Sequence, residues 1–96
     1  MHPRDAEGLE WDEDNEEELW PHGIRPWEVE QVRWNRPVWA KDKREGSGDY
    51  KMVGVTNGGR RLTIVVEVKA AKGLLRPITG WPSTKGELAR YGRGRR

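Results

Sequence analysis

The sequence predicts a small α+β domain with two N-terminal helices, an antiparallel four-stranded meander and a C-terminal helix. Three observations support this fold class. Capping and proline signals mark two helices before residue 37, the apolar period changes to two after Arg36, and a capping box follows the last strand signal. A chain of 96 residues buries only about 60–65% of its unfolded surface, so we expect one domain with a modest core.

The N-terminal part begins with residues 1–8, which carry no periodic apolar pattern and are expected to be flexible. Residues 9–11 can form a short first strand. Asp12 is the expected N-cap of a helix that runs to about residue 20, because carboxylates fill four of the next five positions and suit the positive end of the helix dipole. Pro21 ends this helix.

A second helix is predicted by Pro26, which stands at a first-turn position. Val29 and Val32 share one face of this helix, and Asn35 followed by Pro37 closes it after about two and a half turns. The two helices together supply apolar surface that can cover one face of a sheet.

Four stretches with an apolar period of two predict strands over residues 38–44, 50–56, 62–68 and 75–80. The turns between them contain glycine and lie at residues 46–48, 57–59 and 71–73. Such turns favour a consecutive antiparallel meander. In the third stretch the even-numbered residues are all apolar, which indicates one fully buried face that the two helices cover.

The C-terminal helix begins with Thr84 as N-cap and Glu87 three residues later, which is a capping box, and it ends at Tyr91. Residues 93–96 then form a basic tail that we expect to be flexible. The single folded domain is therefore predicted to span residues 9–92.

The charges are unevenly distributed along the chain. Eleven of the sixteen carboxylates precede Arg33, where only Arg4 and Arg25 oppose them, and the other sixteen lysines and arginines begin at Arg33. The formal net charge of +2 therefore hides roughly −9 against +11. A surface with such unlike halves can attract a polyanion on one side, which favours RNA or a charged protein partner. The alternative is a solvated small protein whose charges are sorted by its secondary structure.

The composition excludes several kinds of site. The chain has no cysteine, so disulfides and thiol chemistry are absent, and its two histidines cannot build the usual zinc site. No apolar run approaches the roughly 20 residues of a membrane span, and no signal peptide opens the chain. We therefore expect a cytoplasmic protein that uses no metal or other cofactor and does not enter a membrane.

Several residues have the chemistry that RNA cleavage without a metal requires. Such cleavage needs a base for the ribose 2′-OH, cations for the phosphorane-like charge and an acid for the leaving oxygen. His22 supplies an imidazole, although at a helix end it can instead cap the last carbonyls. Arg44, Arg60 and Arg76 lie at or near predicted strand ends, where charged side chains more often form a solvated edge.

The fourth predicted strand contains a proline next to an arginine. Because Pro77 cannot donate a hydrogen bond to a ladder, we expect a local distortion near Arg76. In a regular strand Arg76 and Thr79 point to opposite faces, and only a bulge at Pro77 brings them to the same face. Trp81 follows closely and is the tryptophan we expect to stack on an unpaired base, whereas most of the other five are expected in the core or an interface.

A set of residues between positions 9 and 91 carries a family resemblance. These residues are Leu9, Glu10, Trp11, Asp12, Asn15, Leu19, His22, Gly23, Ile24, Pro26, Glu28, Val29, Val32, Gly54, Val55, Thr56, Gly59, Arg60, Leu62, Val65, Arg76, Pro77, Ile78, Thr79, Thr84, Glu87 and Tyr91. None is specific by itself, but in their order and spacing they resemble the BrnT-type toxins, the ribonuclease halves of bacterial type II toxin–antitoxin pairs.

This resemblance implies a compact RelE-like fold, cleavage of RNA without a metal, and neutralisation by a small antitoxin protein. Carried over position by position, it marks as active-face candidates His22, Arg44, Arg60, Arg76, Thr79 and Tyr91. Further candidates for RNA contact are Arg61, Trp81, Lys85 and Arg90. The family often has basic residues where this chain has Pro21 and Trp81, and alanine where it has Gly80, so this chain offers fewer cations to a phosphate.

Two hypotheses about function follow. The first is a toxin endoribonuclease that cuts RNA by 2′-OH attack, with His22 or a nearby lysine as base. In it Arg76 and Arg60 hold the phosphate, and Tyr91 or Arg44 assists. The second is a non-catalytic protein of the same fold that binds an antitoxin or RNA without cleavage. No motif supports a small-molecule enzyme.

Arg76 is our strongest candidate for a preorganised phosphate contact, because the neighbouring proline should fix the local backbone. Its alternative role is structural. In that case its guanidinium would pair with a carboxylate of the acidic first helix, such as Glu16 or Glu17.

Overall fold

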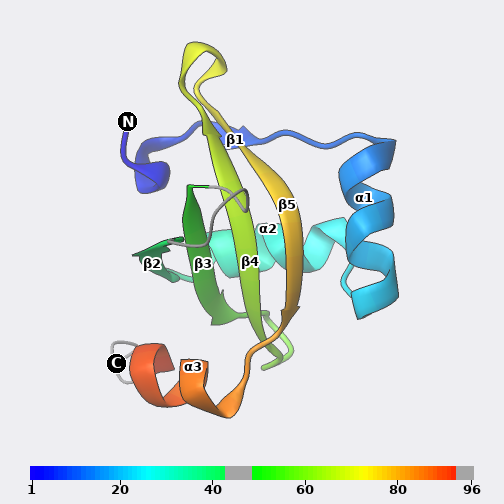
Figure 1. The fold of residues 1–96 in the computed structure, drawn as a ribbon, viewed down its shortest axis with the longest axis vertical. Coiled ribbons are helices and arrows are strands. Elements are labelled where there is room, and N and C mark those ends of the chain that lie inside the picture. Colours follow the sequence, from blue (N-terminus) through cyan, green and yellow to red (C-terminus); the bar gives the residue numbers. More distant parts are fainter. Residues whose placement is uncertain (43–48, 93–96) are drawn as a thin grey trace.

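The computed structural model (Figure 1) describes residues 1–42 and 49–92. Its sheet has five strands in the order β1-β5-β4-β3-β2. The strands are β1 (Gly8–Leu9), β2 (Val38–Lys41), β3 (Tyr50–Val55), β4 (Arg61–Lys69) and β5 (Leu74–Pro82). The α-helices are α1 (Glu13–Leu19), α2 (Pro26–Trp34) and α3 (Lys85–Tyr91), and the 3-10 turns are η1 (Pro3–Asp5), η2 (Trp20–His22) and η3 (Ala70–Lys72). The α+β class is therefore confirmed.

The sheet is mixed because its first strand runs parallel to its neighbour. Strands β2 to β5 form the predicted antiparallel meander. The short first strand, predicted at residues 9–11, lies at Gly8–Leu9 and pairs in parallel with β5, with Leu9 opposite Leu75. The N–H of Glu10 also donates to the carbonyl of Leu75 at 2.7 Å. This pairing brings the acidic residues that precede α1 to the start of β5.

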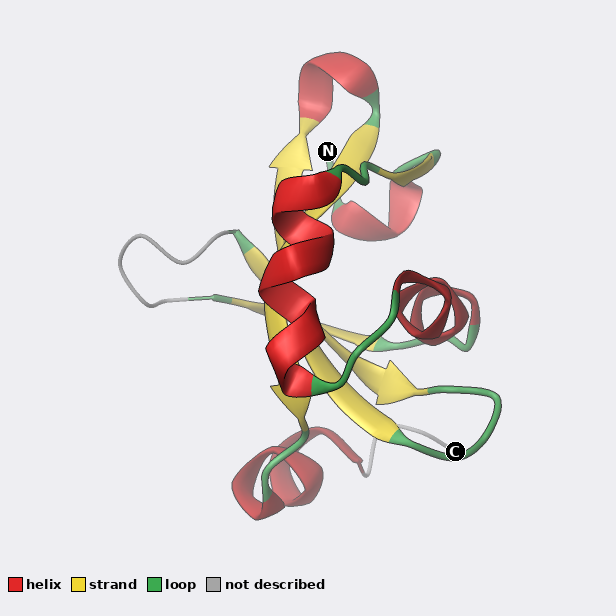
Figure 2. Cartoon of the chain, turned by 90° about the vertical axis from the view of Figure 1, so that its right-hand side faces the viewer, coloured by secondary structure: helices red, strands yellow, loops and turns green. Residues whose placement is uncertain are grey.

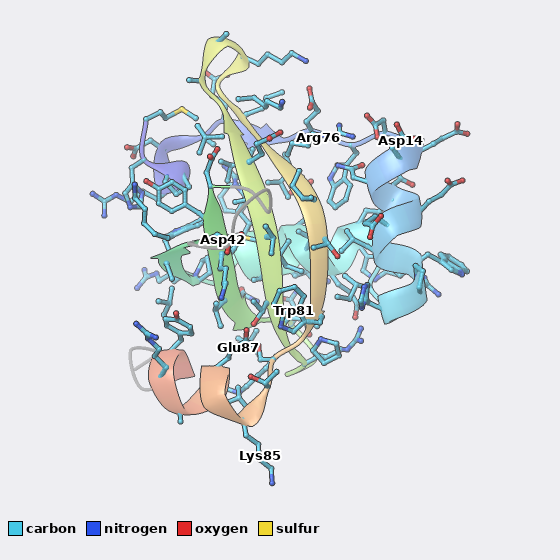
Figure 3. All side chains as sticks on the ribbon, in the orientation of Figure 1. Asp14, Asp42, Arg76, Trp81, Lys85 and Glu87 are labelled. Atoms are coloured by element: carbon cyan, nitrogen blue, oxygen red, sulfur yellow. The ribbon has the colours of Figure 1, made fainter. Side chains whose placement is uncertain are left out.

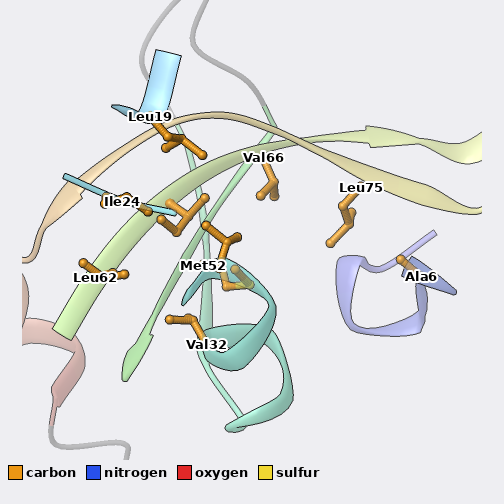
Figure 4. Close-up of a cluster of buried hydrophobic side chains, with 10 residues drawn as sticks. Ala6, Leu19, Ile24, Val32, Met52, Leu62, Val66 and Leu75 are labelled. Carbon is orange, nitrogen blue, oxygen red and sulfur yellow. The ribbon is translucent and has the colours of Figure 1, made fainter. Parts of the chain in front are cut away.

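The N-terminal residues pack on the domain, although their sequence shows no apolar pattern. Pro3 and Ala6 are buried, and the N–H of Glu7 donates to the carbonyl of Gly73 at 2.8 Å. The packed part of the chain thus begins before Leu9, where the sequence placed the domain boundary. The reason is that Ala6 belongs to the same buried cluster as Leu75 (Figure 4). Flexibility of residues 1–8 stays a prediction.

Two of the three α-helices begin with the caps that the sequence indicates. The side chain of Asp12 accepts from the N–H of Asn15 at 3.2 Å, and the Asn15 side chain accepts from the N–H of Asp12 at 2.9 Å. Thr84 and Glu87 form the same reciprocal pair at the start of α3. After α1 the chain tightens into η2 and then turns at Gly23, whose φ of 72° is the left-handed conformation that glycine adopts without strain.

The helices are placed on different sides of the sheet. In Figure 1 α2 crosses behind the sheet and α1 runs beside β5, while α3 lies at the end where β5 finishes. Figure 2 shows the same arrangement from the α1 side. No helix within residues 1–42 and 49–92 is long and apolar enough to cross a membrane.

The core lies between the sheet and α2. Leu62 and Val66 of β4 point into it together with Val32 of α2 (Figure 4). Ile64 of β4 and Val29 of α2 belong to the same buried cluster. We call this side of the sheet the helix face and the opposite side the second face. Thr63 and Val65 of β4, on the second face, are also fully buried, so the sequence-based expectation of a single buried face was incomplete.

Candidate functional site

A bulge in β5 decides which candidate residues share a face. Strand β4 pairs Glu67 with Arg76 and Val66 with Pro77, but the next pair joins Val65 to Thr79, so Ile78 is the extra residue. The register shift is at the proline, where the sequence predicts a distortion. Beyond it, Thr63 pairs with Trp81. Arg76, Thr79 and Trp81 therefore all stand opposite odd-numbered residues of β4, on the second face.

Arg76 lies near the start of α1 (Figure 3), where two carboxylates hold it. Its guanidinium donates to Asp12 at 2.7 and 3.0 Å and to Glu10 at 3.3 Å. Glu10 also accepts from Lys72 at 2.6 Å. The hydrogen bonds from Arg76 lower the pKa of Asp12 to about 2, and in return these carboxylates raise the pKa of Arg76.

The partners of Arg76 differ from those that its structural role suggested. The expected carboxylates were Glu16 or Glu17 of α1, but these side chains flank the exposed Trp20 further along the helix. The parallel pairing of β1 with β5 places Glu10 and Asp12 beside Arg76 instead. Asp12 thus both caps α1 and binds Arg76.

A groove of about 420 Å³ runs between α1 and β5 at the bulge. Its lining residues are Asp14, Asn15, Glu18, Arg76, Pro77, Ile78 and Thr79. Asn15 is 3% exposed and donates from its side-chain amide to the carbonyls of Glu10 at 2.8 Å and Pro77 at 3.0 Å. These bonds fix α1 against the distorted strand. Because Asp14 and Glu18 line the same groove, its charge as it stands does not favour a phosphate.

Arg60 lies in a second region, at the start of α2, where it contacts the residue that follows His22. The Nη1 atom of Arg60 donates to both carboxylate oxygens of Glu28 at 3.0 Å and to the carbonyl of Gly23 at 2.8 Å. His22 is exposed and directly precedes Gly23. The carbonyls that a histidine cap would bind accept instead from the backbone, since the N–H of Gly23 donates to Trp20 at 2.9 Å.

A third group lies where β5 meets α3 (Figure 3). Trp81 donates from Nε1 to Glu87 at 3.0 Å, and the hydroxyl of Thr63 donates to the same oxygen at 3.0 Å. Burial alone would raise the pKa of Glu87, but hydrogen bonds from Thr84, Trp81 and Thr63 lower it overall. The half-buried Trp81 is thus tied to α3 at its nitrogen edge.

The remaining candidates surround α3 or lie outside the described residues. Arg61 and Tyr91 line a narrow cleft between β4 and the end of α3. Lys85 and Arg90 are exposed on α3, and the Arg90 guanidinium lies 5.5 Å from the Tyr91 ring. Arg44 falls outside the residues that the structure describes.

The structure therefore brings the ten candidates together only in part. Arg76, Thr79 and Trp81 share the second face, and Arg60 contacts Gly23, the residue that follows His22. Sequence reasoning did not identify Glu10, Asp12 and Glu28 as the carboxylates that hold the candidate arginines. The sequence signal for Glu10 and Asp12 was the short predicted strand before α1. Only the pairing of that strand with β5 brings these two carboxylates to Arg76.

The tryptophans are distributed differently from the sequence-based expectation. Trp20, Trp27 and Trp34 are 63%, 62% and 74% exposed, respectively. Trp11 and Trp39 pack against the core. Exposed aromatic surface is thus concentrated on and next to α2 rather than on β5.

No protein-family model matches the chain, and no curated protein is significantly similar to it. In residues 1–42 and 49–92, no group of three or more histidine, aspartate or glutamate side chains is placed to hold a metal ion. The resemblance to the BrnT-type toxins remains a prediction from the order and spacing of residues.

Proposed function

We propose that this chain is the toxin of a type II toxin–antitoxin pair and cleaves RNA without a metal, by attack of a ribose 2′-OH. The observation that best supports this proposal is the bulge at Ile78, which aligns a guanidinium, a hydroxyl and an indole on one face of the sheet. Such a row offers a phosphate ligand, a hydrogen-bonding group and a stacking surface along residues 76–81 of one strand.

In this proposal Arg76 and Arg60 stabilise the charge that develops on the phosphate, and His22 or a lysine accepts the 2′-OH proton. Each arginine must first exchange a carboxylate for the phosphate, because Asp12 and Glu28 hold them in the free protein. The net binding free energy is the difference between the arginine–phosphate and the arginine–carboxylate interactions. Binding of RNA is therefore coupled to release of the start of α1.

The test is expression of the chain alone in a bacterial host, followed by incubation of the purified protein with RNA in the presence of a chelator. We expect growth arrest and RNA fragments whose new ends are those of 2′-OH attack. Co-expression with the protein encoded by the neighbouring gene should restore growth if that protein is the antitoxin. Normal growth at a high level of folded protein, with intact RNA, would contradict the proposal.

A second candidate function is supported by the ion pairs themselves. Arg76 and Arg60, the two arginines assigned to the phosphate, are both bound by carboxylates. A non-catalytic protein of this fold, which binds an antitoxin or RNA without cleavage, needs neither of them free. In that case the protein and its Arg76→Ala variant should bind the product of the neighbouring gene, or RNA, with equal affinity. If the protein is the toxin, the two should differ in cleavage of RNA.

A further inference from the structure

A second groove, of about 370 Å³, lies away from α1, where η1, the end of α2 and β2 meet. It is lined by Arg4, Arg33, Trp34, Arg36, Pro37 and Trp39. In Figure 1 these three elements lie on the side of the sheet opposite α1. We call it the α2–β2 groove. None of its residues is among the candidates that the sequence suggested.

The ionisable side chains lining the α2–β2 groove are all arginines. None of the ion pairs within the described part of the chain involves Arg4, Arg33 or Arg36. Arg33 donates to the carbonyl of Ala6 at 2.5 Å, which positions the guanidinium without cancelling its charge. The nearest carboxylates in sequence, on Asp5 and Glu30, do not line the groove. Three positive charges therefore stay available to a polyanion.

An exposed indole stands among these arginines. Trp34 is the most exposed of the large apolar side chains, at 74%. The Arg33 guanidinium lies 5.1 Å from its ring, a cation–π contact that orients the ring while most of its surface remains open. Trp39 is partly buried against the core and forms a fixed wall of the groove. An aromatic ring held between cations is the usual arrangement for stacking an unpaired base.

The backbone beside Trp34 carries strain at a cationic residue. Arg36 has a φ of 54°, in the left-handed region that costs a residue with a Cβ stability relative to glycine. The amide of Asn35 holds this connection by donating to the carbonyl of Val55 and the side chain of Asn57, both at 2.9 Å. A strained residue fixed by its surroundings is a reason to look for a function at that position.

We propose that the α2–β2 groove binds single-stranded RNA, with one base stacked on Trp34 and the adjoining phosphates on Arg33, Arg36 and Arg4. The proposal goes beyond the proposed cleavage function, because it uses none of the residues on β5. It needs neither an antitoxin nor a reaction. The exposed ring favours nucleic acid over an acidic peptide, since a peptide carboxylate would use the arginines and leave Trp34 uncovered.

The test is the affinity of the full chain for a labelled RNA of about ten nucleotides whose 2′-hydroxyls are methylated. Methylation removes the nucleophile, so cleavage cannot disturb the measurement and a failure of the ribonuclease proposal is seen separately, on unmodified RNA. We expect Trp34→Ala to weaken binding about 5- to 150-fold, the value of one stacked base. Trp34→Phe should restore part of the loss.

Trp27→Ala is the matched control. Trp27 lies on the same helix and is 62% exposed, but it does not line the groove. We expect this variant to bind the methylated RNA like the wild-type chain. Arg33→Gln and Arg36→Gln should each lower the slope of log affinity against log salt by about 0.7. Thermal melts of all variants identify any loss of binding that reflects unfolding.

Three results would overturn the proposal. One is the absence of RNA binding by the folded protein. Another is an equal loss of RNA affinity in the Trp27→Ala and Trp34→Ala variants, which would show that the loss does not depend on a tryptophan in the groove. The third is binding of a polyglutamate peptide of equal charge as tightly as RNA, with the same dependence on Trp34, which would identify an acidic protein segment as the occupant.

Discussion

The region where Arg76 meets Glu10 and Asp12, which we call the β5 side, and the α2–β2 groove both contain arginine, but the guanidinium charges have different partners. On the β5 side Arg76 is bound by Asp12 and Glu10. In the groove Arg33 is bound by a neutral backbone carbonyl, and Arg36 belongs to no ion pair within the described residues. The same residue type thus holds the fold together in one place and remains open to a ligand in the other.

This difference shows that counting cations does not locate a polyanion site. Arg76 of β5 and the acidic residues before α1 come from the two unlike halves of the sequence, and folding brings them into contact. A phosphate that binds Arg76 must compete with a carboxylate already present, whereas Arg36 belongs to no ion pair within residues 1–42 and 49–92. The β5 side is therefore suited to binding that is coupled to a conformational step, and the groove to binding without one.

The largest effect is expected for Arg76→Ala on RNA cleavage. If Arg76 stabilises the transition state, its loss should reduce the rate about 100- to 1000-fold, as removal of one preorganised donor does. Arg76→Lys should restore only part of the rate, because an ammonium cannot form the bidentate contact. The melting temperature of Arg76→Ala should also fall, since Asp12 and Glu10 lose their partner. Rate and melt are measured on the same sample.

Asp12→Asn separates the two roles of Arg76. Asparagine caps a helix about as well as aspartate, so α1 should keep its start, while the charge that competes with a phosphate is removed. We expect weaker pairing with Arg76 and tighter binding or faster cleavage of RNA. If the variant has a lower melting temperature but binds and cleaves RNA as before, Arg76 is a purely structural residue. The arginines of the two regions would then have entirely different roles.

Gly80→Ala should cause the next largest effect, on stability. A Cβ at this position would lie 2.7 Å from Cδ1 of Ile64 and 2.9 Å from the backbone oxygen of Thr63, so the strands must shift. We expect a loss of about 1–3 kcal/mol in the free energy of unfolding, measured with urea. The alanine that BrnT-type toxins often have there would thus not fit this sheet unchanged.

The matched control is Gly86→Ala, in α3. Its added Cβ would meet only an ordinary contact, 3.9 Å from the Thr84 hydroxyl, and alanine favours a helix by about 0.5–1 kcal/mol over glycine. A gain here and a loss at Gly80 would show that the register of β5 is fixed by close packing. Equal, small changes in the free energy of unfolding at both positions would mean that the β5 side accommodates an added methyl group readily. The difference between the β5 side and the open groove would then be smaller.

The fold could be predicted because its signals are local. The caps at Asp12 and Thr84 and the alternation in β4 specify elements that form as expected. The pairing of β1 with β5 joins residues more than sixty positions apart, and a strand of two residues carries almost no pattern. Its consequence, the capture of Arg76 by Asp12, was therefore not foreseen.

A smaller effect is expected in the acid stability of the β5 side. The pKa values of Asp12 and Glu10 are lowered in the folded protein, so these groups stabilise it above their ordinary values of 3.8 and 4.5. That contribution is lost as the pH falls from about 4 to about 2, because both carboxyls become protonated. Arg76→Ala should show a shallower fall in this range. Glu87 also has a lowered pKa and serves as an internal reference, since the substitution leaves it unchanged.

Parallel curves for the two proteins would mean that the ion pair adds nothing to folding. Arg76 would then be as available to a ligand as the arginines of the α2–β2 groove, despite its short contacts. The groove itself has no carboxylate in its lining. Substitution of its arginines should therefore leave the decrease in stability at acidic pH unchanged.

The site was harder to predict than the fold because exposure and pairing depend on neighbours from distant segments. Trp34 and Trp81 are both flanked by basic or turn residues in sequence, and only the structure shows that Trp81 is tied to Glu87 while Trp34 is open. The positive φ of Arg36 has no signal in its residue type, since arginine rarely adopts that conformation. A preceding asparagine and a following proline indicate a turn without specifying it.

The smallest expected effect, and the most direct test of the groove, is that of Arg36→Gly. Glycine relieves the left-handed strain of about 1–2 kcal/mol at φ 54° but makes the unfolded chain more flexible, which offsets about 0.5–1 kcal/mol. The net result should be a gain of roughly 0.5–1 kcal/mol, or a rise of about 2–8 °C in melting temperature. The same variant should bind RNA more weakly, because one cation is gone.

Arg36→Lys keeps both the charge and the strained backbone, so its stability should stay near that of the unmodified protein and most of its affinity should remain. A protein that becomes more stable as it loses affinity has a residue kept for binding rather than for folding. A less stable Arg36→Gly variant would instead show that this guanidinium supports the fold, and the groove would then resemble the β5 side.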